Sequence, residues 1–189
     1  MAGTTHGVVR VYNVQTGSCY INESTSQHTE QINALSYSAD GKMFASCSAD
    51  GKIKLWDGVS MSNIATIDDI KAEVTSVQLS KNSKYLLSAS KDGYVRLYDL
   101  SNGAPIFHLQ TGNPTEVRTQ ALFSHNEDFI YTTNSSPTGY IFDTRTHQQV
   151  ASLDGHLKPI KSIATSPTDN SIITCSLDNR ARFWHATEY

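Results

Sequence analysis

Apolar and polar residues alternate in short runs along the chain, and turn residues separate one run from the next. Alternation with a period of two is typical of β-strands that bury one face. No segment keeps an apolar period of 3.6 residues, so we expect few helices. In one stretch the turns Asp40-Gly41 and Asp50-Gly51 lie between expected strands. The four strands expected there are Ile32–Tyr37, Met43–Ser46, Lys52–Trp56 and Asn63–Ile67.

A strand that closes on an aromatic residue recurs five times. The aromatic residues are Tyr12, Trp56, Tyr98, Phe142 and Trp184, at spacings of 44, 42, 44 and 42 residues. Self-similarity at one fixed period is the signature of a repeat architecture. Four short strands in each period are what a blade of a β-propeller requires. We therefore predict an all-β, incomplete propeller of about four and a half blades out of a probable seven.

The repeat boundaries follow from this period. The third copy is expected to contain the strands Val74–Leu79, Tyr85–Ser88, Tyr94–Tyr98 and Pro105–Leu109. Its Pro105 fits an outer edge strand, where a missing N–H is tolerated. We expect the first unit to supply only its last two strands and the last unit to lack its fourth strand. The whole chain is one repeat region, with units at about 1–27, 28–69, 70–111, 112–154 and 155–189.

Two of the copies carry the same set of polar and aromatic residues, His28, Ser46, Asp50 and Trp56 in one and His156, Thr174, Asp178 and Trp184 in the other. These copies resemble repeats of the WD40 family, and the resemblance implies a hydrogen-bonded tetrad in each. The third copy keeps Ser88 and Asp92, has Tyr98 in place of Trp, and has residues 71–73 where the His is expected. In the fourth copy residues 134–138 replace the Asp turn. We expect other contacts to fix these two blades.

A Ser, a His and an Asp that recur together also raise the possibility of a catalytic triad. A hydrolase needs one exposed nucleophile with its base, an orienting carboxylate and an oxyanion hole. Here the set occurs twice at equivalent repeat positions and includes a Trp, which favours a structural network. The other histidines lack metal-ligand spacing, and the sequence has no phosphate loop or G-x-S-x-G motif. We expect no enzyme activity, no metal, no cofactor and no small-molecule substrate.

Composition narrows the class of partner. The 189 residues include 15 Lys and Arg against 18 Asp and Glu, for a net charge of −3, which disfavours an autonomous nucleic-acid binder. No apolar run reaches the length of a membrane span, and no secretory signal opens the sequence, so we expect a soluble intracellular protein. Cys19, Cys47 and Cys175 form no C-x-x-C motif, and the last two occupy equivalent repeat positions that suit small buried side chains.

Four basic residues lie two positions before the repeated aromatic residue. One hypothesis is a ring of cations for RNA phosphates. The other is that each stem packs along its own blade with the cation against the aromatic ring. We favour the second, because there is one such residue per blade and acidic residues outnumber basic ones. The four residues are Arg10, Lys54, Arg96 and Arg182.

Several stretches depart from the general repeat pattern, namely residues 51–60, 80–88, 118–123 with His125 and 127–128, and 180–184. These stretches resemble the subunit 1 family of the cleavage stimulation factor, whose members are WD40 proteins. This resemblance covers essentially the whole chain and corresponds to the last four and a half of seven repeats. It implies a non-enzymatic, nuclear scaffold subunit in pre-mRNA 3′-end cleavage and polyadenylation. Implied partners are the other subunits, above all a helical-repeat scaffold subunit, and the tail of RNA polymerase II, with RNA contacted only indirectly.

The alternative is a generic WD40 adaptor in another complex, such as a ubiquitin ligase. In either case a propeller presents loops on rigid blades, so we predict a partner surface on its narrow face. The alternative for these residues is that they lie on ordinary solvated loops and bind no partner. An open arc also exposes apolar blade faces, so we expect the chain alone to associate or aggregate. The candidate surface consists of Gln31, Ala49, Lys71, Glu73, Lys91, Glu116, Arg118, Lys158 and Leu177.

Overall fold

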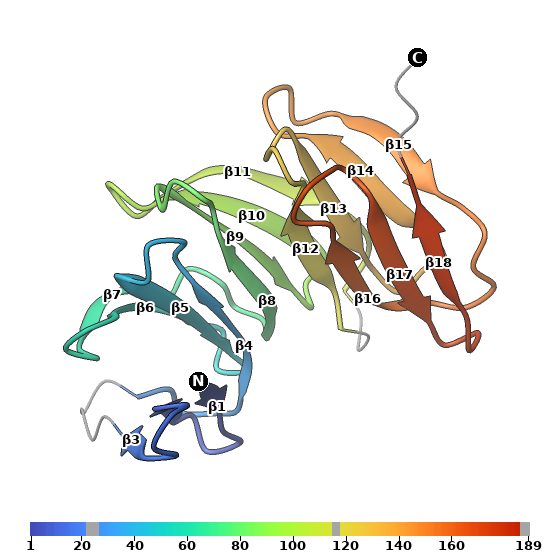
Figure 1. Cartoon of the computed structure of the whole chain (residues 1–189). Coiled ribbons are helices and arrows are strands. Elements are labelled where there is room, and N and C mark those ends of the chain that lie inside the picture. Colours follow the sequence, from blue (N-terminus) through green and yellow to red (C-terminus); the bar gives the residue numbers. More distant parts are fainter. Residues whose placement is uncertain (22–26, 115–117, 186–189) are drawn as a thin grey trace.

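Five antiparallel sheets follow one another along the chain and form an open arc (Figure 1). The computed structural model describes residues 1–21, 27–114 and 118–185. We number the sheets as blades 1 to 5 and call their strands a to d from the inside outward. Every regular element in the described part is a strand, which confirms the all-β, partial propeller. No helix that could cross a membrane occurs in these ranges.

Within each blade the strands pair in the order in which the chain visits them. Blade 1 contains β1 (Ala2–Gly3), β2 (Val9–Tyr12) and β3 (Cys19–Ile21). Blade 2 contains β4 (Ile32–Tyr37), β5 (Met43–Ser48), β6 (Ile53–Asp57) and β7 (Asn63–Ile67). Blade 3 contains β8 (Val74–Leu79), β9 (Tyr85–Ser90), β10 (Tyr94–Asp99) and β11 (Ala104–Gln110). Blade 4 contains β12 (Gln120–Phe123), β13 (Phe129–Thr133), β14 (Gly139–Asp143) and β15 (Gln149–Leu153). Blade 5 contains β16 (Ile160–Thr165), β17 (Ile172–Ser176) and β18 (Ala181–Trp184).

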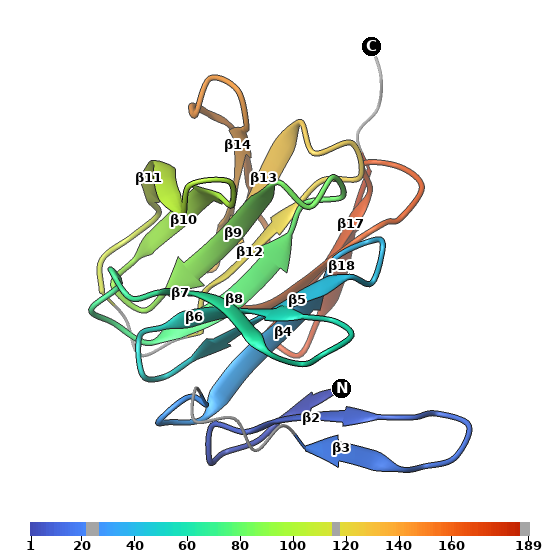
Figure 2. The ribbon, with the colours of Figure 1, turned by 90° about the vertical axis from the view of Figure 1, so that its left-hand side faces the viewer.

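Blade 1 has one more strand than the sequence predicts. We expected only its last two strands, but β1 pairs with β2 through Ala2↔Arg10 and Gly3↔Val9. This strand has two residues and no alternating pattern, so periodicity could not reveal it. Blade 1 lies at the end of the arc beside β4 (Figure 2).

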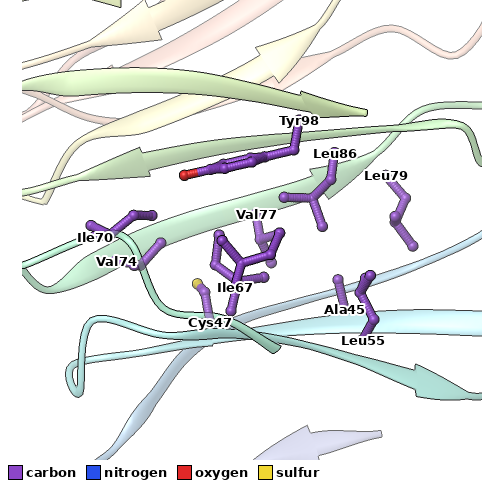
Figure 3. Close-up of a cluster of buried hydrophobic side chains, with 11 residues drawn as sticks. Ala45, Cys47, Leu55, Ile67, Ile70, Val74, Val77, Leu79, Leu86 and Tyr98 are labelled. Carbon is purple, nitrogen blue, oxygen red and sulfur yellow. The ribbon is translucent and has the colours of Figure 1, made fainter. Parts of the chain in front are cut away.

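The main core lies between the faces of consecutive blades. Ala45, Cys47 and Leu55 of blade 2 pack against Val77 and Leu86 of blade 3, all with exposed fractions of 6 % or less (Figure 3). Burying a side chain of the size of Leu contributes about 1.5–3 kcal/mol relative to leaving it exposed. A second cluster between blades 3 and 4 and a third between blades 4 and 5 repeat this arrangement. The blades are therefore held together face to face.

Hydrogen bonds between inner strands add a second link from blade to blade. Leu79 N–H donates to Ser36 Oγ at 3.0 Å, and Phe123 N–H donates to Gln78 Oε1 at 2.8 Å. Ile163 N–H makes the corresponding bond to Gln120 Oε1 at 2.9 Å. Each bond satisfies a backbone donor of strand a with a side chain of the preceding blade. These contacts fix how neighbouring inner strands align.

The face of blade 5 that points away from blade 4 is not covered by another blade, and here one sequence expectation is wrong. Cys47 is buried as expected, but its equivalent Cys175 is exposed. Ile173 and Phe183 are 46 % and 67 % exposed, whereas their equivalents in blade 2 are covered by blade 3. The cysteine position is buried only where a following blade covers it.

This open face leads to a prediction about association. We expect the 189-residue chain alone to self-associate, because apolar side chains on β17 and β18 lose exposed area when another surface covers them. The double substitution Ile173→Lys and Phe183→Lys should lower the association constant by at least about tenfold. Sedimentation velocity over a range of concentrations measures this. Ile64→Lys, at an exposed residue of β7, is the matched control, and a parent chain that stays monomeric would contradict the expectation.

Candidate functional site

Four side chains in blade 2 form a continuous buried hydrogen-bond chain. Trp56 Nε1–H donates to Ser46 Oγ at 2.8 Å, and Ser46 Oγ lies 2.8 Å from His28 Nε2. His28 Nδ1 lies 2.9 Å from Asp50 Oδ2. The chain joins β6, β5, the segment before β4 and the turn between β5 and β6, so it ties together the inner part of the blade.

The direction of each hydrogen bond in this chain follows from the one member that can act only as a donor. The indole N–H of Trp56 only donates, so Ser46 Oγ accepts it and gives its own hydrogen to His28 Nε2. His28 then carries its proton on Nδ1 and donates it to Asp50. Burial lowers the pKa of His28 and outweighs the opposing effect of the Asp50 carboxylate. The neutral imidazole is therefore the form that completes the network.

The carboxylate at the end of this chain is held by backbone groups as well. Asp50 accepts from Thr29 N–H at 3.0 Å and from Lys52 N–H at 2.9 Å. Burial would raise the pKa of Asp50, but these N–H donors and His28 together hold it below its usual range. The same carboxylate thus fixes the turn between β5 and β6 and the start of the blade.

Blade 5 repeats this geometry. Trp184 Nε1–H donates to Thr174 Oγ1 at 2.9 Å, Thr174 Oγ1 lies 2.8 Å from His156 Nε2, and His156 Nδ1 lies 2.9 Å from Asp178 Oδ2. Burial would raise the pKa of Asp178, but hydrogen bonds from Leu157 N–H and His156 hold it far below its usual range. The two sets occupy equivalent repeat positions and make equivalent hydrogen bonds.

Blade 3 uses a different ion pair in place of the histidine. The residue at the position of His28 is Ile70, which is 4 % exposed and belongs to the core, so residues 71–73 do not replace the His. Asp92 instead binds Arg96, whose Nη2 lies 2.6 Å from Asp92 Oδ2. Tyr98 Oη donates to Asp69 Oδ1 at 3.0 Å. Burial and the adjacent Asp69 carboxylate raise the pKa of Tyr98 strongly, so the phenol stays protonated.

The tetrad hydroxyls of blades 3 and 4 have lost their partners. Ser88 Oγ and Thr132 Oγ1 are buried and make no hydrogen bond to a described residue. Both residues are 0 % exposed, as is Ser46. The blade-4 aromatic is Phe142, which has no polar group to offer. These two hydroxyls therefore contribute no side-chain network, in contrast to Ser46 and Thr174.

The geometry of the two complete sets argues against nucleophilic catalysis. Ser46 and Thr174 are 0 % exposed, and each hydroxyl already accepts an indole N–H. A substrate carbonyl could not approach either oxygen without displacing the Trp. The described residues also include no cluster of three or more His, Cys, Asp or Glu side chains that could hold a metal ion.

The four basic strand residues do not share one environment. Arg96 pairs with Asp92 and lies 5.2 Å from the ring centroid of Tyr94. This is the only cation–π contact within the described ranges, and the ring is not that of the repeated aromatic Tyr98. Lys54 Nζ lies 3.5 Å from Thr66 Oγ1, the Arg182 guanidinium lies beside Gly155, and Arg10 is exposed. The expected packing of a cation on the repeated aromatic ring is therefore wrong.

The candidate partner surface lies where strand a begins and strand b ends. Three blades repeat one backbone hydrogen bond there: Ala49 N–H to Gln31 O at 3.0 Å, Lys91 N–H to Glu73 O at 2.9 Å, and Leu177 N–H to the Pro159 carbonyl at 3.1 Å. In blades 2 and 3 this bond joins two candidate residues, and in blade 5 it joins Leu177 to the residue that follows Lys158, so the candidates lie at one end of their sheets.

A polar network joins this surface across three blades. Lys91 Nζ lies 2.7 Å from Glu73 Oε2, and Asn33 Nδ2 donates to Glu73 Oε1 at 3.0 Å. Arg118 donates to Thr75 O at 3.2 Å and to the Asn33 carbonyl at 2.9 Å. Sequence reasoning missed Asn33, since its spacing carries no repeat signal. Glu73 and Arg118 bond to Asn33 of blade 2 and Lys91 pairs with Glu73, so all three residues are partly structural.

The remaining candidates differ in exposure. Gln31, Lys71 and Lys158 are exposed, Leu177 is 44 % exposed, and Ala49 is half-buried. Glu116 lies outside the described residues. Lys71 and Lys158 are thus the candidates that offer a charge without a contact between blades.

Comparison with known proteins assigns the family. The model of the WD domain, G-beta repeat matches residues 20–57, 62–99 and 147–185, which together make up more than half of the chain. The chain belongs to the WD40 repeat family. The three matches include the aromatic positions Trp56, Tyr98 and Trp184. They leave out the degenerate blade 4 except for its last strand, β15.

Individual WD40 relatives are between a quarter and a third identical to the chain over the aligned residues. Cleavage stimulation factor subunit 50 of Arabidopsis thaliana is 31 % identical over 97 % of the chain and 44 % of its own length. Pre-mRNA-processing factor 19 of Oryza sativa is 28 % identical over 83 % of the chain and 30 % of its length. The periodic tryptophan protein 2 homolog of Caenorhabditis elegans is 31 % identical over 83 % of the chain and 17 % of its length. The chain thus spans less than half of the length of each of these three relatives.

The WD40 networks predict unequal effects of removing equivalent hydroxyls. Ser46→Ala should lower the free energy of unfolding by about 2–4 kcal/mol, because it leaves Trp56 N–H and His28 without their partner. Ser88→Ala and Thr132→Val should change it by less than about 1 kcal/mol, because those hydroxyls have no partner to lose. Urea denaturation followed by tryptophan fluorescence measures the three values. Equal losses at Ser46 and Ser88 would refute the assignment.

The lowered pKa of His28 predicts a loss of stability in mild acid. The unfolded histidine takes up a proton below about pH 6.5, whereas the folded one does so only at lower pH. Stability is therefore complete above pH 6.5 and declines below it, until the folded pKa is reached, by at most about 1.4 kcal/mol for each pH unit. Urea denaturation at pH 7.5 and 5.5 measures the decline, and His28→Gln should make it smaller. An unchanged decline in that variant would show that other groups cause it.

Proposed function

We propose that this chain is part of a non-enzymatic WD40 scaffold subunit of the machinery that cleaves and polyadenylates pre-mRNA, in the role of the cleavage stimulation factor. The observation that carries the proposal is that the similarity to cleavage stimulation factor subunit 50 combines 31 % identity with coverage of 97 % of the chain. A nuclear location follows from this role.

The geometry is suited to holding partners rather than to chemistry. Face-to-face packing and the buried networks make each blade rigid, so loops at the ends of the sheets bind with little loss of conformational entropy. We infer that the partners are a helical-repeat scaffold subunit and the tail of RNA polymerase II. The net charge of −3 supports only indirect contact with RNA.

A second candidate is a WD40 adaptor in another complex, such as a ubiquitin ligase. It is favoured by the similar identity to pre-mRNA-processing factor 19 and to the periodic tryptophan protein 2 homolog, at 28 % and 31 %. Affinity capture of the full-length gene product from nuclear extract, with identification of the bound chains, separates the two. Capture of cleavage-factor subunits supports the first, and their absence together with another complex supports the second.

Charge reversal on the candidate surface tests where these partners bind. Lys71→Glu combined with Lys158→Glu should reduce the captured cleavage-factor subunits by at least about fivefold, because both residues are exposed and carry no contact between blades. Lys91 and Arg118 are less suitable, since reversing Arg118 breaks bonds between blades and reversing Lys91 breaks its ion pair with Glu73. Lys42→Glu, at the opposite end of the sheets, is the matched control. Unchanged capture in the double variant would exclude this surface.

A further inference from the structure

A hollow of about 260 Å³ lies at the end of the sheets opposite the candidate surface. It is lined by residues at and just after the ends of the inner strands β4, β8, β12 and β16. Leu79 and Phe123, 6 % and 4 % exposed, form part of its apolar wall, and Tyr37 is 43 % exposed beside them. Four blades therefore contribute to one concave site.

Two stretches that set this sequence apart from general WD40 repeats meet at this hollow. Lys81 belongs to the stretch 80–88, and His125 and Glu127 belong to the stretch that follows β12. Lys81 Nζ lies 3.3 Å from His125 Nδ1, and Lys81 N–H donates to Glu127 Oε1 at 2.5 Å. Residues about one blade apart in sequence are thus joined at the rim by one bond between side chains and one from a backbone N–H to a carboxylate.

Glu127 occupies a backbone conformation that a glutamate rarely adopts. Its φ of 63° lies in the left-handed region, as does that of Gly41 at the equivalent turn position of blade 2. Glycine suits this conformation better. Ser83 at the equivalent position of blade 3 has the same conformation, so what sets this turn apart is the Glu127 carboxylate, which reaches Lys81 N–H of the neighbouring blade.

The hydrogen bonds at the rim of the hollow leave some N–H donors of Lys81 and His125 without an acceptor among the described residues. A lysine ammonium only donates, so His125 Nδ1 accepts and the imidazole proton is on Nε2. The other ammonium hydrogens of Lys81 and the Nε2–H of His125 make no hydrogen bond to a described residue. An anionic oxygen acceptor would satisfy these donors with charge-assisted bonds.

We propose that this hollow binds an acidic side chain of a partner protein, with its carboxylate on Lys81 and His125 and its aliphatic part against Leu79 and Phe123. The volume is suited to one side chain rather than to a separate small ligand. A single cation beside the Glu127 carboxylate favours a monoanion over a phosphate dianion. The proposal deepens the proposed function, since it adds a second contact surface to the same scaffold.

Because Glu127 lies close to Lys81, the proposal predicts opposite effects on binding for substitutions at these two residues. Lys81→Gln should weaken binding of an acidic peptide by at least about fivefold, because a charge-assisted bond is lost. Glu127→Gln should strengthen it by about two- to threefold, because the amide oxygen still accepts Lys81 N–H while the repulsion is removed. Lys84→Gln should leave it unchanged, since Lys84 is an exposed cation of the same turn that does not line the hollow.

The probe is a fluorescein-labelled peptide of alternating Glu and Leu residues, measured by fluorescence anisotropy with the 189-residue chain, and its Gln–Leu counterpart is the control. Stronger binding of the Glu peptide with the three expected responses supports the proposal. No preference for the Glu peptide, equal effects of Lys81→Gln and Lys84→Gln, or displacement by millimolar inorganic phosphate would overturn it.

Failure of this inference and failure of the proposed function give different results. If the full-length protein captures cleavage-factor subunits but the Glu peptide fails to respond to Lys81→Gln, the acidic site is wrong and the function stands. If the peptide responds as expected but no cleavage-factor subunit is captured, the site stands and the function is wrong.

Discussion

Every part of this structure depends on the burial of one blade face by the next. A four-stranded sheet has two broad faces, and its strands alternate apolar side chains between them, so a blade depends on a neighbour to cover each apolar face. The consequence is visible at a single repeat position, where Cys47 is covered by blade 3 and Cys175 is open at the end of the arc. Face-to-face packing is non-directional, however, and it does not set how one blade is aligned on the next. That alignment is left to the hydrogen bonds of the inner strands, such as Leu79 N–H to Ser36 Oγ.

The buried polar networks add specificity within a blade, and they do so unevenly. Blades 2 and 5 use a neutral histidine between a hydroxyl and a carboxylate, whereas blade 3 uses the permanent cation of Arg96. Both arrangements satisfy an aspartate in the turn after strand b, so the aspartate is the shared element and its partner varies. Blade 4 has neither arrangement, and there Asn134 Nδ2 donates instead to the Thr111 carbonyl. A blade therefore needs its turn fixed by some buried polar contact, but no single set of residues is required.

The sequence predicts those features that depend on local pattern. The strands Ile32–Tyr37 and Val74–Leu79 were expected with the bounds that the structure has, because alternation and flanking turns define them. Features that depend on a residue from another blade were not predicted. The Tyr98 bond to Asp69 and the role of Asn33 arise from residues that meet only after the arc forms, and periodicity gives no information on such pairs. The exposure of Cys175 was mispredicted for the same reason, since repeat equivalence describes a position within a blade and not what covers it.

The two ends of the sheets differ in how much of their chemistry is already used. Where strand a begins, Glu73 and Lys91 pair with each other within blade 3 and Arg118 donates to carbonyl groups of two preceding blades, so a partner gains little from them without displacing an existing bond. Where strand a ends, Lys81 and His125 keep donors that no described residue accepts. Residues that hold the arc together are already engaged by the fold, whereas Lys81 and His125 keep hydrogen-bonding capacity beside a concave apolar wall. The turns that follow β8 and β12 therefore differ from the network of Glu73, Lys91 and Arg118 in the donors that they leave unused.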